Sequence, residues 1–182
     1  MDLNSLLREV SIDPETTLVL RHRPKEPDLR RVLPWLAAEQ PDVFNAYQQT
    51  QTPKVEKQMM KASHVVSLIG DQGGRGLFVG LYENQGHRVT RLSDRRKISG
   101  KCELSKYGHL VHGKKCLWFD LSLTEHFQDW AGKLIVRWPP PEISWSRWSA
   151  KNRFDVIAIR EESLLNQHMP DWRDMTFTWH DL

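Results

Sequence analysis

Short apolar segments joined by short turns dominate the chain after residue 63, and this pattern limits the fold more than any other feature. Two of them, HVVSLIG and LFVGLYE, flank the glycine-rich turn DQGGRG and predict a β-hairpin. CLWFDLSL, KLIVRW and FDVIAIREE are rich in β-branched and aromatic residues and predict three further strands. Because no crossover helices separate these strands, they favour an antiparallel or mixed sheet that curls on itself.

The first third of the chain has helical periodicity instead. Residues 3–10 form an amphipathic pattern, and Asp28 can cap a helix with apolar residues on one face. Pro34 is expected to kink or restart that helix. Pro41 and Pro53 each mark the start of another helix, because proline is favoured at the first helical position.

Strands are also predicted at residues 16–21 and at 174–182, and Gly80 predicts a bulge or a close backbone approach. The length of 182 residues fits one domain. The predicted fold is therefore a single α+β domain, with a helical opening at 1–62 and a β-rich body at 63–182. The body is expected to be a curled, mostly antiparallel, barrel-like sheet.

Positive charge is concentrated in the middle of the chain. The net charge is only +3, but the segment 87–115 contains nine Lys and Arg and two acidic residues. Such a concentrated field most often meets a phosphate backbone, although a solvated basic loop is the alternative. The candidate phosphate-binding residues are Arg95, Arg96, Lys97, Lys101, Lys114 and Lys115.

Tryptophan is the second unusual feature, with eight residues in the chain. Three of them lie in WPPPEISWSRW, where they could stack on bases or close the end of a barrel, and both interpretations stay open. A carboxylate on the strand CLWFDLSL could accept a hydrogen bond from the exocyclic amine of a base. The predicted base pocket consists of Tyr47, Trp118, Asp120, Trp138, Trp145 and Trp148.

Side-chain amides are grouped in the segment FNAYQQTQ, where a predicted helix ends. Amides pair in two-point fashion with base edges, so Asn45, Gln48 and Gln49 are candidate base-edge contacts. The alternative is an ordinary polar helix end.

The spacing of the candidate residues gives little support to a metal site or to a hydrolytic site. Cys102, His109, His112 and Cys116 contain no Cys-x-x-Cys pair, and Asp120, Glu125, Asp129 and Lys133 do not match a nuclease core. We therefore predict no catalytic residues, no metal and no cofactor. The two cysteines suit a reducing cytoplasm, and the chain has neither a secretory signal nor an apolar run that would span a membrane.

Several segments together resemble the N-terminal region of bacterial GIY-YIG nuclease family proteins. They are LRHRPKEPDLRRVLPWL, FNAYQQTQ, HVVSLIGDQGGRGLFVGLYE, LWFDLSL, KLIVRW and MPDWRDMTFTWHDL. The resemblance implies the DNA-recognition part of a modification-dependent restriction-type enzyme, since no Gly-Ile-Tyr…Tyr-Ile-Gly motif is present. The strand ending FVGLY looks like those of the PUA-like group (SRA, EVE, YTH and ASCH domains), and a B3-like pseudobarrel is the alternative fold.

The resulting hypothesis is a non-catalytic domain that binds double-stranded DNA. It would sense a modified cytosine, such as 5-methylcytosine, by flipping it into an aromatic pocket. Two alternatives stay open: a divergent metal-dependent nuclease that uses Asp120, and a protein-interaction module whose basic segment meets an acidic partner.

Overall fold

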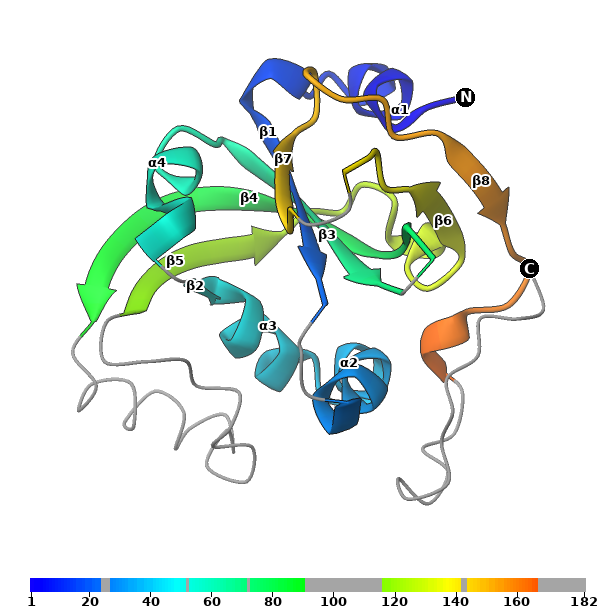
Figure 1. The fold of residues 1–182 in the computed structure, drawn as a ribbon, viewed down its shortest axis with the longest axis horizontal. Coiled ribbons are helices and arrows are strands. Elements are labelled where there is room, and N and C mark those ends of the chain that lie inside the picture. Colours follow the sequence, from blue (N-terminus) through cyan, green and yellow to red (C-terminus); the bar gives the residue numbers. More distant parts are fainter. Residues whose placement is uncertain (24–26, 52, 72, 91–115, 142–143, 167–182) are drawn as a thin grey trace.

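One mixed sheet, with eight strands among the described residues, curls into a half-barrel and organises the protein (Figure 1). The computed structural model describes residues 1–23, 27–51, 53–71, 73–90, 116–141 and 144–166. The strands are β1 Thr17–His22, β2 Thr50–Gln51, β3 His64–Gly70, β4 Arg75–Thr90, β5 Cys116–Leu123, β6 Leu134–Arg137, β7 Ser146–Trp148 and β8 Val156–Ile159. Within the described ranges, no helix is long and apolar enough to cross a membrane.

The strand order confirms the predicted curled, mostly antiparallel sheet. The main path is β2-β5-β4-β3-β1-β7, and β6 joins β4 to β8. Only β1 and β3 pair in parallel among these described strands, in the register Thr17↔His64 to His22↔Ile69. The helices between β1 and β3 make the crossover that a parallel pair requires. The α+β class predicted from the sequence is therefore confirmed.

The helices are α1 Leu3–Glu9, α2 Pro27–Glu39, α3 Pro41–Gln49 and α4 Glu56–Met59, and short 3₁₀ turns occur at Pro14–Thr16, Pro53–Val55, Gln128–Trp130 and Leu164–Asn166. The starts of α1 and α3 match the prediction, whereas Asp28 is the second residue of α2 rather than its cap, and Pro53 begins a 3₁₀ turn before α4. Helix α2 continues through Pro34, where a kink or a restart was expected. A proline there removes one helical hydrogen bond. Burial of Leu33 and Leu36 on either side of it offsets that loss.

The two faces of the sheet carry different helices, and alternation along β1 separates them. Val19 packs on one face with α1, Trp138 and Phe154. Leu18 and the other inward residues of β1 lie on the opposite face, which α2, α3 and α4 cover. In Figure 1, α1 is accordingly drawn above the sheet, while α2 and α3 lie below it.

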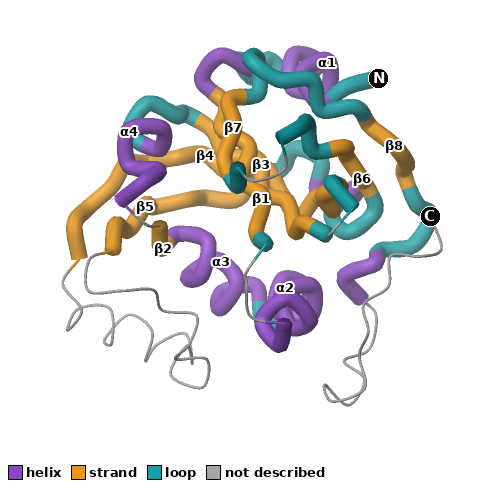
Figure 2. The backbone as a smooth tube through the Cα atoms, viewed as in Figure 1, coloured by secondary structure: helices purple, strands orange, loops and turns teal. Residues whose placement is uncertain are grey.

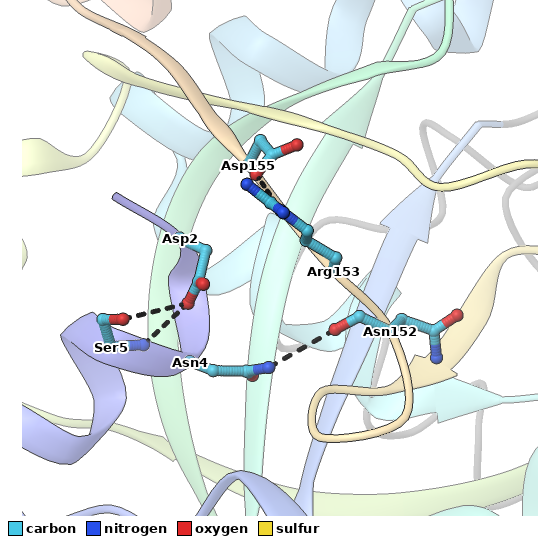
Figure 3. A network of polar contacts seen from close by, with 6 residues as sticks. All are labelled: Asp2, Asn4, Ser5, Asn152, Arg153 and Asp155. Atoms are coloured by element: carbon cyan, nitrogen blue, oxygen red, sulfur yellow. Dashed lines mark hydrogen bonds and ion pairs between the residues drawn. The ribbon is translucent and has the colours of Figure 1, made fainter.

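A polar network fastens α1 to the chain that leads into β8 (Figure 3). Asp2 caps the helix, because its Oδ1 accepts from the Ser5 backbone N at 2.9 Å. Asn4 Nδ2 donates to the Asn152 carbonyl oxygen at 3.3 Å, and Asp2 forms an isolated bridge with Asp155. These contacts have a structural explanation and require no ligand.

The bulge predicted at Gly80 is present in β4. The register with β3 shifts between Ser67, which faces Gly80, and Leu68, which faces Phe78. A Cβ atom at residue 80 would lie 2.7 Å from Leu123 Cδ1 and 3.0 Å from Tyr82 Cε2. Glycine at this position therefore makes room for the Tyr82 ring on the helix-covered face of the sheet.

Candidate nucleic-acid interface

A buried polar cluster lies on the helix-covered face, at the end of β1. His22 ends this strand and is only 8% exposed. Its Nε2 is 3.0 Å from the Oγ of Ser67, a fully buried residue of the neighbouring strand β3. Two polar side chains thus interrupt an otherwise apolar surface at adjacent positions.

Helix α3 covers this pair with two rings and an amide. Phe44, Tyr47 and Gln48 share one helix face, because residues three and four positions apart lie side by side. The His22 ring centroid lies 5.6 Å from that of Phe44 and 5.3 Å from that of Tyr47, both in edge-on arrangements. Phe44 is buried, whereas Tyr47 is only half-buried, so Tyr47 forms the outer side of the cluster.

The Gln48 amide is the central polar group. Gln48 is fully buried, and its Nε2 donates to Asn45 Oδ1 at 2.9 Å. Its Oε1 is also buried but receives no hydrogen bond from any described residue. The amide lies close enough to His22 and Tyr82 to act on the pKa of each. An unsatisfied buried oxygen costs about 1–3 kcal/mol, so this group requires an explanation.

His22 and Tyr82 are neutral near pH 7. Burial lowers the pKa of His22 to about 4, and the Gln48 amide opposes this only in part. Burial also raises the pKa of Tyr82 to about 12, which keeps its hydroxyl protonated. Uncharged donors and acceptors between aromatic rings suit a neutral, planar, hydrogen-bonding ligand such as a nucleobase.

The strands that lead into and out of the basic segment pair with each other close to helix α3. Thr90 of β4, the last described residue in the first part of the segment, pairs with Cys116 of β5, which follows the segment directly. The next residue of β5, Leu117, pairs with Gln51 of β2, and β2 directly follows α3. Figure 2 shows β2, β5 and α3 together at this edge of the sheet. The predicted phosphate-binding residues lie between Thr90 and Cys116, outside the described residues.

The described members of the predicted base pocket do not come together. Tyr47 packs in the cluster of α2 and α3, Trp148 packs beside Leu18 and Tyr82, and Trp138 packs on the opposite face with Phe154. Trp145 is 40% exposed in the loop before β7. Trp118 pairs through its backbone with Thr50 of β2, and its side chain lies outside what the structure describes. The structure therefore does not bring these described residues into one pocket, because Trp138 and Trp148 lie on opposite faces of the sheet.

Asp120 also lies apart from the cluster. Its neighbours on β5, Phe119 and Leu121, are buried, whereas Asp120 is exposed on the other face of the strand. Of the predicted base-edge amides, Asn45 and Gln48 belong to the cluster. The third, Gln49, donates from Nε2 to the Leu121 carbonyl oxygen at 3.1 Å and so ties α3 to β5.

Trp138 instead organises a packing site on the α1 face. It is 1% exposed, its backbone N donates to the Gly74 carbonyl oxygen at 2.7 Å, and Phe154 lies edge-on to its ring. The guanidinium carbons of Arg21 and Arg147 lie 4.7 Å and 5.8 Å from its ring centroid. Two roles were considered for the tryptophans of WPPPEISWSRW: stacking on bases or closing the end of the barrel. Trp138 has the second role, because its ring packs in the core.

The residues considered for metal binding form no metal site in the part of the chain that the structure describes. In the described ranges, no three His, Cys, Asp or Glu side chains are placed to hold a metal ion. Cys102, His109 and His112 lie outside those ranges.

Sequence reasoning missed His22, Ser67 and Tyr82. They come from three different strands, β1, β3 and β4, and the available signal was their spacing. His22 follows Leu20, and Tyr82 follows Gly80, by two positions on the same face. Only the register between strands reveals that the three meet.

No family model matches the chain, and neither a curated protein nor a solved structure matches it.

Proposed function

We propose that this chain is a DNA-recognition domain of a restriction-type system. It binds the duplex backbone through the basic segment and holds one flipped base, a modified cytosine, beside Tyr47 and Gln48. The resemblance in sequence to GIY-YIG nuclease proteins suggests this role, and one structural observation carries it. Helix α3, which supplies Tyr47 and Gln48 to the neutral polar cluster, leads directly into β2, and β2 pairs with β5 where that strand leaves the basic segment.

The two parts have complementary tasks in this proposal. Phosphate contacts position a protein on DNA and supply affinity, but they carry no sequence information directly. Discrimination then comes from the cluster, where a base exchanges its stacking in the duplex for contacts with aromatic rings and hydrogen bonds. Extruding a base costs a few kcal/mol, and such a site compensates for that cost.

Simultaneous replacement of Arg95, Arg96 and Lys97 by alanine tests the phosphate contacts. The slope of log affinity against log salt concentration should fall by up to about 2.7, at ~0.9 per lost contact. Fluorescence anisotropy with a labelled 20-base-pair duplex, a length of about two helical turns, measures the slope over a salt series.

A matched variant replaces Lys54, Lys57 and Lys61, which are exposed on or beside α4, by alanine. It removes the same charge and should leave a slope close to that of the unmodified protein. A slope unchanged by the first triple replacement would contradict the assignment of phosphate contacts to the basic segment.

A further inference from the structure

The Gln48 amide interacts with His22 and Tyr82, but its oxygen receives no hydrogen bond of good geometry from a described residue. Gln48 Nε2 donates to Asn45 Oδ1 at 2.9 Å. The Oε1 end of the amide is therefore the end that points toward the rest of the cluster. Oε1 is buried and receives no hydrogen bond from the described residues. The neighbouring Gln49 offers a contrast, because its Nε2 donates to the Leu121 carbonyl oxygen and links helix to strand.

The groups around Oε1 restrict what can satisfy it. His22, Phe44 and Tyr47 form a group of rings whose centroids lie 5.3 to 6.3 Å apart, and the Gln48 amide interacts with the His22 ring of that group. No described residue of the cluster carries a formal charge near pH 7, so an anion or a metal ion finds no compensating charge there. A flat, neutral ligand with an N–H donor fits both the rings and the acceptor.

We propose that Gln48 Oε1 accepts a hydrogen bond from the exocyclic N4 amine of the flipped cytosine, and that this contact selects the base. The inference rests on the proposed function and identifies the atom that performs the recognition. A carbonyl oxygen attracts an amino group and repels another acceptor, such as O4 of uracil or thymine. Modification at C5 of cytosine leaves the N4 amine in place.

The site is closed without a base, which determines how the base enters. Gln48 is 0% exposed and Tyr82 is 3% exposed, whereas Tyr47 is half-buried on the outer side. An entering cytosine therefore displaces the Tyr47 ring and stacks beside it. Entry from this side brings the base in beside α3, which leads into β2 next to the strand β5 that follows the basic segment.

Duplexes with an unpaired internal bubble test the contact, because their bases are already out of the stack. One duplex carries cytosine in the bubble, and the other carries 2-pyrimidinone, which is cytosine without its amino group. The unmodified protein should bind the cytosine duplex about tenfold more tightly, which corresponds to ~1.4 kcal/mol for the contact. In Gln48→Met, which keeps the side-chain length but removes the acceptor, the ratio should fall to about one.

Gln49→Met is the matched control, because it removes an amide from the same helix outside the cluster. It should keep the tenfold ratio. Equal binding of both duplexes by the unmodified protein would overturn this inference and leave DNA binding intact. An unchanged ratio in Gln48→Met would also overturn it. Failure to bind either duplex at low salt would overturn the proposed function itself. If Gln48→Met does not fold, the affinities of the unmodified protein for the two duplexes still test the contact with the N4 amine.

Discussion

Replacing Trp138 by alanine is expected to lower the free energy of unfolding by about 3–5 kcal/mol, the usual cost of emptying a large buried site. The indole is 1% exposed and packs edge-on against Phe154, with ring centroids 5.4 Å apart. It also provides the aromatic face over which the Arg21 guanidinium lies, at 4.7 Å. Urea denaturation at pH 7 measures the loss, and Trp138→Phe should recover part of it.

The comparison with Trp145 separates packing from ligand binding. Trp145 is 40% exposed, so Trp145→Ala should change the free energy of unfolding by less than about 1 kcal/mol. If Trp138→Ala instead kept its stability and lost its discrimination among bases, Trp138 would belong to the binding site, as the sequence alone predicted. That result would contradict the placement of Trp138 in the core.

Acidification should destabilise the protein through His22. Its pKa is about 4 in the folded protein, whereas an unfolded histidine titrates near 6.5, so the unfolded chain binds more protons between these values. The stability that the neutral ring contributes is complete above pH 6.5 and declines as the pH falls. The loss from this group should reach about 2 kcal/mol at pH 5 and about 3 kcal/mol at pH 4.

The His22→Gln variant isolates this effect, because it removes the titrating ring. Its free energy of unfolding should vary less between pH 7 and pH 4 than that of the unmodified protein, by about 3 kcal/mol. Urea denaturation in a pH series provides the curves. His126→Gln, at an exposed histidine, is the control and should follow the unmodified protein. Parallel curves for His22→Gln and the unmodified protein would show that His22 is not held neutral by burial.

The periodic parts of the fold could be predicted from sequence. The hairpin of β3 and β4, the strands β5, β6 and β8, and the starts of α1 and α3 carry local signals that the structure confirms. Strands β2 and β7 could not be predicted, because they have two and three residues and form only by pairing with distant partners. Likewise, the parallel pairing of β1 with β3 depends on the helical crossover, which the strand patterns do not show.

The candidate site also has a part that could be predicted from the sequence and a part that could not. Asn45, Tyr47 and Gln48 lie on one helix, so their grouping is local and the segment FNAYQQTQ already indicated it. His22 and Tyr82 come from separate strands and join that group only through the sheet register. The prediction grouped Trp138 and Trp148 because they are close in sequence. The fold instead places them on opposite faces of the sheet.

Binding to a panel of otherwise identical duplexes tests the central claim most directly. The panel carries cytosine, 5-methylcytosine, 5-hydroxymethylcytosine, glucosylated cytosine, 6-methyladenine or phosphorothioate, and a gel shift at one fixed salt concentration compares them. A domain that flips and recognises a modified cytosine should favour one of the modified cytosine duplexes, by about tenfold or more. Equal affinity for every duplex would contradict modified-base recognition and leave only general binding to DNA.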